Sequence, residues 1–220
     1  MKRQFQKELD KKIEGFVKNG EVPRLLIHSC CAPCSSYVME YLSQYFSITI
    51  FYYNPNITDP EEYHRRVEEQ KRLIAQFPAK HEITFVEGAY EPECFTQAVK
   101  GMEHCPEGGE RCFQCFELRL AKTAQIAQDG KYDYFTTTLT ISPLKNAEKL
   151  NEIGEKMAEI YTGTAFLNSD FKKKNGYKRS VELSRVYGLY RQDYCGCIYS
   201  KLEREHQKAM NAVKNEKEKI

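Results

Sequence analysis

Short apolar runs alternate with amphipathic stretches along most of the chain. The apolar runs are rich in β-branched and aromatic residues and end at turn residues, which predicts buried strands. The expected strands cover residues 24–29, 47–53, 83–86, 132–139 and 164–167. Between them, apolar residues recur every three or four positions, as in helices with one buried face. The expected helices cover residues 4–19, 35–45, 59–76, 92–100, 112–128, 146–160, 180–190 and about 198–219.

Strands that alternate with helices predict an α/β fold around a mainly parallel sheet of about five strands. We expect a single domain over 1–220, with a core at about 24–200 and an extra helix at each terminus. In such sheets, ligands bind beyond the carboxyl ends of the strands. The loop 30–34, the loop after Tyr53 and the segment 140–143 all lie at that edge.

The composition fits a soluble globular protein. Hydrophobic residues make up 41% and charged residues 29%, and the net charge of +2 implies no partner by itself. The sequence has no run of about 18 apolar residues that could span a membrane, and no apolar segment of a signal peptide follows Met1. We therefore expect a cytoplasmic protein with no membrane partner. In that reducing setting, nine cysteines indicate ligands or redox groups rather than a disulfide framework.

Seven cysteines fall in three tight groups, Cys30/Cys31/Cys34, Cys112/Cys115 and Cys195/Cys197. The second pair has the spacing that lets both thiolates project from one side of a helix start, where negative charge is favoured. Four thiolates suit either a [4Fe–4S] cluster or a structural zinc ion. The first group reads Cys-Cys-x-x-Cys, which is not the pattern of a zinc ribbon and favours iron–sulfur.

Cys195 and Cys197 are separated only by Gly196. Residues two apart can form a disulfide, and so small a ring would be strained and therefore redox-active. Ligation of a second metal is the alternative. Cys94 and Cys105 stand alone and are not assigned to a site, because lone cysteines are more often buried or incidental.

Several segments together resemble the cobalamin-independent epoxyqueuosine reductases of the QueH family. They are LIHSCCAPC at 26–34, FYYNPNI at 51–57, PEGGERCFQCF at 106–116 with Arg119 and Leu120, TTTLTISP at 136–143, DFKK at 170–173 and YCGC at 194–197. The matches run from about residue 24 to residue 200. Each motif alone is unspecific, and their combination is highly specific.

The resemblance implies an iron–sulfur oxidoreductase that removes the epoxide oxygen of epoxyqueuosine at the wobble position of tRNA, leaving queuosine. It implies that Cys30, Cys31, Cys112 and Cys115 bind a [4Fe–4S] cluster, and that Cys195 and Cys197 form a redox-active disulfide pair. The family also has an additional mononuclear iron, and Cys34 is the candidate to help hold it.

The resemblance further implies a sheet like that of the ATP pyrophosphatases that modify tRNA. Those enzymes place a phosphate-binding loop after the first strand, whereas this chain has SCCAPC at 29–34. Pro33 removes an amide that a phosphate cradle could use. ATP chemistry is therefore disfavoured.

Deoxygenation of an epoxide needs two electrons and two protons, so a proton source and an electron donor are expected. The donor is not identified by the sequence. Asp193, Tyr194 and Glu110 lie beside cysteine motifs and are candidate proton sources, with a solvated surface role as the alternative for each. Asp193 is placed with Cys195 and Cys197 in the predicted catalytic set.

A basic cluster lies between the last strand and the third cysteine group. It comprises Lys172, Lys173, Lys174, Lys178 and Arg179, with Phe171 and Tyr177 among them. Cations contact phosphates and aromatic rings stack on unpaired bases, so the cluster suits an anticodon loop. Such a run can also be plain solvated surface. The alternative to the reductase is a zinc-stabilised tRNA-binding module without redox chemistry.

Overall fold

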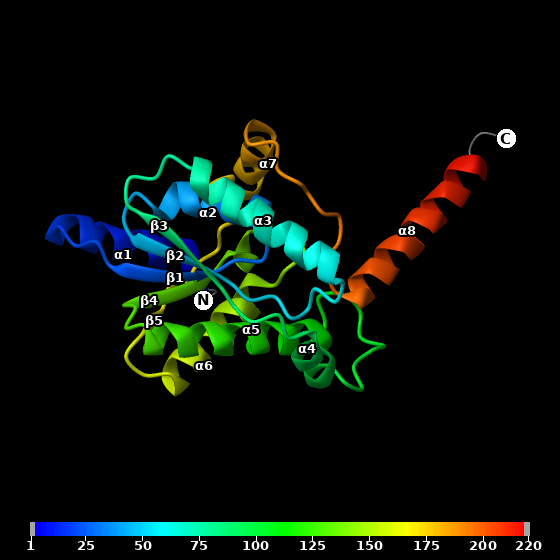
Figure 1. The fold of residues 1–220 in the computed structure, drawn as a ribbon, viewed down its shortest axis with the longest axis horizontal. Helices are drawn as coiled ribbons and strands as arrows, with labels where there is room; N and C mark the ends of the chain where they lie inside the picture. The colour runs from blue at the N-terminus through cyan, green and yellow to red at the C-terminus, as the bar shows by residue number, and fades with distance from the viewer. Residues whose placement is uncertain (1–2, 218–220) are drawn as a thin grey trace.

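The computed structural model describes residues 3–217 and contains a five-stranded parallel sheet (Figure 1). The strands are β1 (Arg24–His28), β2 (Ser47–Tyr52), β3 (Ile83–Glu87), β4 (Tyr134–Thr137) and β5 (Ala165–Phe166). Their order in the sheet is β3-β2-β1-β4-β5, and every pair is parallel. The α/β fold with a parallel sheet is therefore confirmed.

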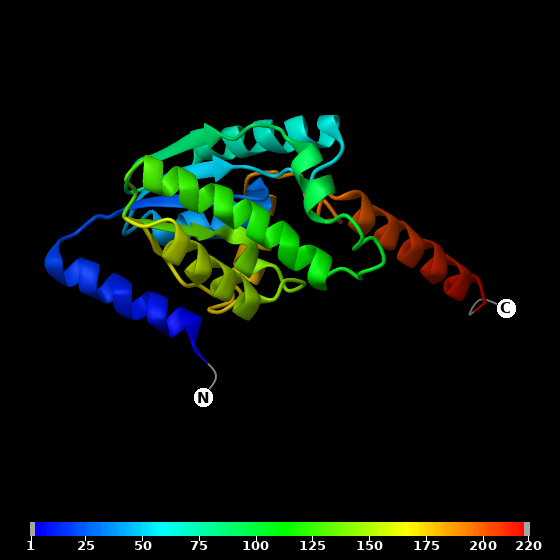
Figure 2. The same ribbon diagram turned by 90° about the horizontal axis from the view of Figure 1, so that it is seen from below.

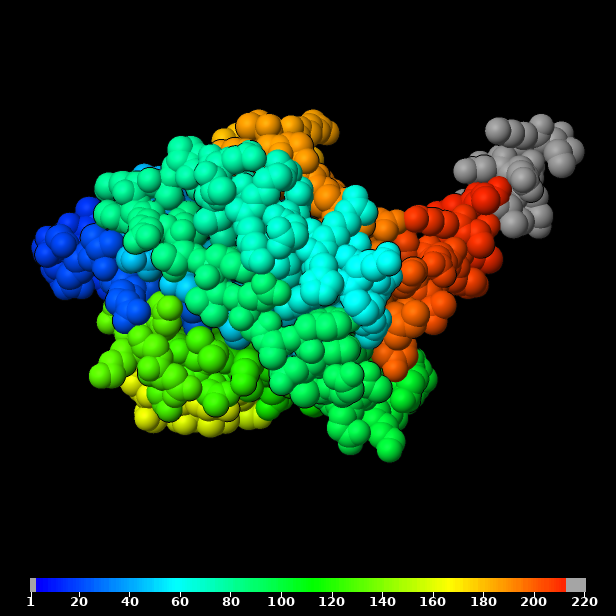
Figure 3. Space-filling model, viewed as in Figure 1, coloured from blue at the N-terminus to red at the C-terminus, as the bar shows by residue number. Residues whose placement is uncertain are grey.

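Helices cover both faces of the sheet. They are α1 (Phe5–Asn19), α2 (Ala32–Leu42), α3 (Pro60–Gln76), α4 (Pro92–Ala98), α5 (Glu110–Asp129), α6 (Ala147–Ile160), α7 (Gly176–Val186) and α8 (Ile198–Lys217), with a 3₁₀ turn η1 (Thr138–Ile141). Helices α2, α3 and α7 lie on one face, and α5 and α6 on the other (Figure 1). Helix α8 projects away from the body (Figure 3).

The two faces of β1 explain why the sheet is covered on both sides. Leu25 and Ile27 pack into the core beneath α1 and α2, whereas Leu26 packs into the core formed with α5 and α6. Successive side chains of a strand point to opposite faces, so a strand between two helical layers must be apolar at every position. This strand is central, and the loop that follows it lies in the middle of the sheet edge.

Several expected boundaries differ from the structure at the edge where the cysteines lie. Helix α2 begins at Ala32, three residues early, because Cys31 is extended and Pro33 fits a first helical turn. Cys34 is therefore helical. The fourth strand stops at Thr137, whose hydroxyl accepts a hydrogen bond from the Leu139 N–H and starts η1. Helix α7 starts at Gly176, four residues early.

Helix α1 attaches to the body through an apolar stripe and one carboxylate. Leu9 and Ile13 are buried in the core with α2. Asp10 accepts hydrogen bonds from Gln6 Nε2 at 2.9 Å and Tyr41 Oη at 2.7 Å, and pairs with Lys174 Nζ at 2.7 Å. These contacts fix the helix against both α2 and the loop that precedes α7.

We expect Asp10→Asn to lower the free energy of unfolding by about 0.5–1 kcal/mol near neutral pH. Burial raises the pKa of Asp10, but hydrogen bonds from Lys174, Tyr41 and Gln6 lower it more, so it lies below its ordinary value. The folded state therefore holds this proton more weakly than the unfolded state. The stabilisation is present above the unfolded pKa and is lost as the pH falls through the folded pKa.

Urea unfolding at several pH values tests this prediction, with Glu14→Gln on the exposed face of α1 as the control. The difference between wild type and Asp10→Asn should shrink as the pH falls below the ordinary pKa of an aspartate and through the lowered folded pKa of Asp10. A difference that stays constant with pH would show that the charge of Asp10 is not what stabilises α1.

Candidate cysteine-lined active site

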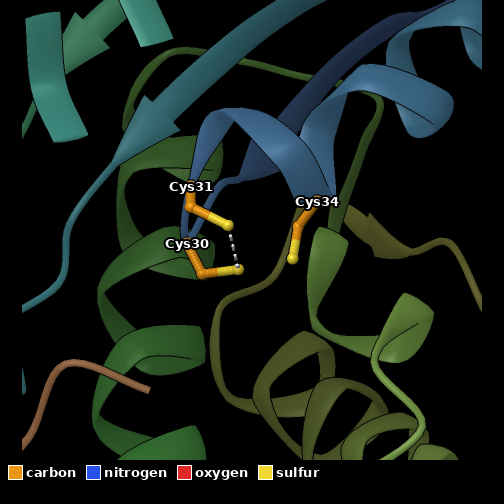
Figure 4. Close-up of side chains that lie close together, drawn as sticks. All are labelled: Cys30, Cys31 and Cys34. Carbon is orange, nitrogen blue, oxygen red and sulfur yellow. Dashed lines mark hydrogen bonds between the residues drawn. The ribbon is translucent and has the colours of Figure 1, made fainter. Parts of the chain in front are cut away.

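The first cysteine group lies directly beyond the carboxyl end of β1. Cys30 and Cys31 form the link to α2, and Cys34 lies in the first turn of that helix. The three sulfur atoms lie within 4.8 Å of one another, and the Cys30 and Cys31 sulfurs are 3.8 Å apart. Figure 4 shows the three side chains converging on one space. Three soft ligands this close could hold a metal ion.

Neighbouring strands and η1 orient this loop. Thr138 Oγ1 accepts a hydrogen bond from the Cys30 N–H at 3.3 Å and lies 3.5 Å from the Cys30 sulfur. His28 is fully buried, with Nδ1 2.9 Å from Thr137 Oγ1 and Nε2 3.1 Å from the Tyr53 carbonyl oxygen. Burial lowers the pKa of His28 to about 3, so the ring is neutral. Its nitrogens are both occupied, and it is a structural residue beside the cysteines.

The second group lies at the start of α5. This helix begins at Glu110, two residues before the expected start, so Cys112 and Cys115 occupy its first two turns. The Gly108 N–H donates to the Cys112 sulfur at 3.2 Å. Burial, the largest effect, raises the pKa of Cys115 to about 12 in the metal-free chain. Metal binding at Cys115 must therefore displace a proton.

The third group lies in the loop before α8. The Cys195 carbonyl accepts a hydrogen bond from Arg66 Nη1 at 3.1 Å, which fixes the loop against α3. Gly196 has φ +115°, a region closed to most side chains, and a Cβ there would also press on Ile57. All nine cysteines lie in the described part of the chain and carry free thiols. A disulfide between Cys195 and Cys197 stays a prediction.

Two cavities bring the three groups together. One of about 430 Å³ is bordered by Cys30, Cys31, Cys34 and Cys195. A smaller one, of about 20 Å³, is bordered by Cys112, Cys115, Cys195 and Cys197. Cys195, Glu107 and Lys145 border both cavities. The structure thus gathers all seven grouped cysteines, whereas Cys94 and Cys105 border neither cavity.

Buried cations surround the thiols. Arg66, Arg111 and Arg119 are among the largest fully buried side chains. Burial lowers the pKa of Arg119, but the sulfurs of Cys115, Cys195, Cys30 and Cys112 raise it above its ordinary value. Within the part of the chain that is described, Arg119 Nη2 is buried and has no hydrogen-bond partner. An unpartnered guanidinium nitrogen among thiols fits an anionic group held by those thiols.

Lys145 is a site residue that the sequence did not identify. Its Nζ lies 3.4 Å from the Cys195 sulfur. Burial lowers the pKa of Lys145, but Cys195, Cys30 and Glu107 together raise it more, and the net pKa lies above the ordinary value. The sequence feature that could have identified Lys145 is its position just after η1, at the same edge of the sheet as the cysteines. Arg111 and Arg119 stand in segments that resemble the family, but nothing in the sequence indicated that they or Arg66 are buried, since charged helix positions are usually exposed.

The three candidate proton sources lie in different surroundings. Asp193 and Tyr194 border the larger cavity, but Glu110 borders a separate surface hollow between α5 and α6. The Asp193 carboxylate pairs with Lys208 at 2.5 Å, and this lysine lowers the pKa of Asp193. The predicted role of Asp193 stays a prediction, and its carboxylate is ionised near neutral pH.

The basic cluster divides between two surfaces. Tyr177 borders the cysteine cavity, whereas Lys172, Lys173 and Lys174 border another groove. Arg179 of α7 pairs with Glu40 of α2 at 2.6 Å. Among the described helices, none combines the length and apolar character needed to cross a membrane.

Comparisons with known proteins agree on one family. The family model described as epoxyqueuosine reductase QueH matches residues 25–203. Relatives named epoxyqueuosine reductase QueH include one from Streptococcus pyogenes, 47% identical over 83% of this chain and 72% of the relative. One from Staphylococcus epidermidis is 43% identical over 90% of this chain and 85% of the relative. One from Thermotoga maritima is 36% identical over 84% of this chain and 94% of the relative.

Proposed function

This chain belongs to the epoxyqueuosine reductase QueH family, and from that premise we propose that it reduces the epoxide of epoxyqueuosine in tRNA to the cyclopentene of queuosine. The observation that carries the proposal is the convergence of seven thiols from three distant segments on two adjoining cavities. A tRNA substrate would place the reaction in the cytoplasm.

In this proposal, Cys30, Cys31, Cys112 and Cys115 hold a [4Fe–4S] cluster. Cys34 helps hold an additional iron, and this role is supported by the position of its sulfur, within 4.8 Å of the sulfurs of Cys30 and Cys31. When bound, the cluster supplies electrons. The buried guanidinium of Arg119 balances the negative charge of the thiolates, because an uncompensated buried charge is costly.

Cys195 and Cys197 are proposed as the redox-active pair. Oxidation of their two thiols to a disulfide releases two electrons and two protons. Reduction of the epoxide breaks both of its C–O bonds, consumes two electrons and two protons, and releases the oxygen as water. An unidentified electron donor then restores the two thiols. Lys145 keeps an ammonium group beside the Cys195 sulfur, where it orients that side chain and holds a proton close to the reaction.

The larger cavity suits an extruded nucleoside. Its volume of about 430 Å³ lies within the usual range for small-ligand sites. Tyr177 and Tyr194 border it and offer rings against an unpaired base. Enzymes that modify a nucleobase take it out of the stack, so the wobble nucleotide would enter here while the rest of the tRNA stays outside.

The test is turnover under anaerobic conditions. The metal-reconstituted protein is incubated with a chemical reductant and tRNA that carries epoxyqueuosine, and the digested nucleosides are analysed by mass spectrometry. We expect epoxyqueuosine to be replaced by a product that lacks one oxygen. Unchanged epoxyqueuosine in the presence of a fully loaded protein would contradict the proposal.

A further inference from the structure

A groove outside the cysteine site has a strongly basic lining. It has a volume of about 790 Å³ and lies between the first residues of α1, the start of α6 and the loop after β5. We call it the α1 groove, and it is lined by residues 3–7, 10, 145–148, 170 and 172–174. Figure 2 shows the first turn of α1 close to the loops around α6. Helix α1 precedes the segment that the family model matches, which begins at residue 25.

Cations outnumber carboxylates in this lining. The cations are Arg3, Lys7, Lys145, Lys172, Lys173 and Lys174, and the carboxylates are Asp10, Glu148 and Asp170. Lys7 and Lys173 are exposed, and neither is ion-paired within the described residues. Two exposed, unpaired lysines from distant parts of the chain thus border the same groove, and their charges are available to an anionic partner.

The α1 groove adjoins the larger cysteine cavity, because Lys145 lines both. Lys172 fixes this junction, since its Nζ donates to the Thr140 carbonyl at 3.1 Å and to the Lys145 carbonyl at 3.3 Å. The Asp10–Lys174 pair joins α1 to the loop after β5. Both walls of the groove are therefore held in place without a ligand.

We propose that the α1 groove binds the phosphate backbone of the anticodon arm next to the wobble nucleotide. This inference rests on the proposed function. A strand that lies along the groove ends at Lys145, where its next nucleotide can enter the cysteine cavity. Lysines at a groove act on phosphates through charge and fix the register of a nucleic acid without reading its bases. Helix α1 thereby contributes to RNA binding although it lies outside the matched segment.

The double variant Lys7→Gln/Lys173→Gln tests the groove. We expect its Kd for the tRNA to rise about tenfold at about 0.1 M salt, and the slope of log K against log salt to become shallower by about 1–2. The matched control is Lys18→Gln/Lys131→Gln, which removes the same charge at exposed positions outside the groove. Both variants should keep the wild-type circular dichroism spectrum, and the control should also keep the wild-type Kd and salt slope.

The possible outcomes distinguish a failure of the groove proposal from a failure of the proposed function. Suppose that the wild-type protein binds and reduces the tRNA, but the groove variant has the same affinity and salt slope as the control. This result would overturn only the proposal that the α1 groove binds the anticodon arm. A metal-loaded wild-type protein that neither binds nor reduces the tRNA would overturn the proposed function, and the groove with it. A selective loss in the groove variant supports both.

Discussion

Cys195→Ser is expected to reduce the turnover of epoxyqueuosine in tRNA by about 10³-fold or more, with no loss of bound iron. In the proposed reaction, Cys195 and Cys197 supply the two electrons, and a serine hydroxyl cannot form a disulfide. Cys197→Ser should have the same effect, although its sulfur lies in a different setting, 3.4 Å from the Ser200 N–H. Turnover and iron content are measured on the same anaerobic preparation.

The control for both substitutions is Cys94→Ser, because Cys94 is exposed and lies outside both cavities. It should keep wild-type turnover and iron. If Cys195→Ser instead loses iron in step with activity, Cys195 is a metal ligand, and the electron-supplying role assigned to the pair is wrong.

Lys145→Met is expected to lower kcat by about 10²-fold, again with unchanged iron content. The ammonium lies 3.4 Å from the Cys195 sulfur, and methionine replaces the aliphatic part of the side chain while removing the charged group and its protons. Lys145→Arg should recover part of the lost rate, since it restores the charge. Single-turnover kinetics with saturating tRNA separates this effect from weaker binding.

A suitable control is Lys149→Met, four residues further along the chain, where the lysine pairs with Glu152 at 2.6 Å on the surface of α6. It should retain nearly full kcat. If the Lys145→Met protein has the wild-type kcat at saturating tRNA, Lys145 takes no part in the reaction and has only a structural or RNA-binding role.

Local sequence patterns were sufficient to predict the framework of the fold. The continuous apolar run in β1 indicated a strand buried on both faces, and Asp59 before Pro60 indicated a helix start that the structure confirms. The start of α2 was wrong by three residues because the apolar periodicity begins only after its first turn. The extended Cys31 that starts this helix is fixed by neighbouring elements, so periodicity carries no sign of it.

The candidate site could be predicted only as separate groups. The spacing of the cysteines indicates a metal or redox role, but it does not reveal that Cys195 borders the cavities of both other groups. That arrangement depends on how α5 and the loop before α8 pack against the sheet edge. The same holds for Arg119, whose full burial among thiols follows from tertiary packing rather than from its position on an amphipathic helix.

The metal content of protein purified without oxygen tests the central claim most directly. If the cysteines of the first two groups assemble one iron–sulfur site, the protein is brown and contains about four sulfides and four to five irons per chain. Spectrum, iron, zinc and sulfide are determined on one sample. A colourless protein with one zinc and no sulfide, even after attempted reconstitution of the cluster, would contradict the account and favour a zinc-stabilised RNA-binding module.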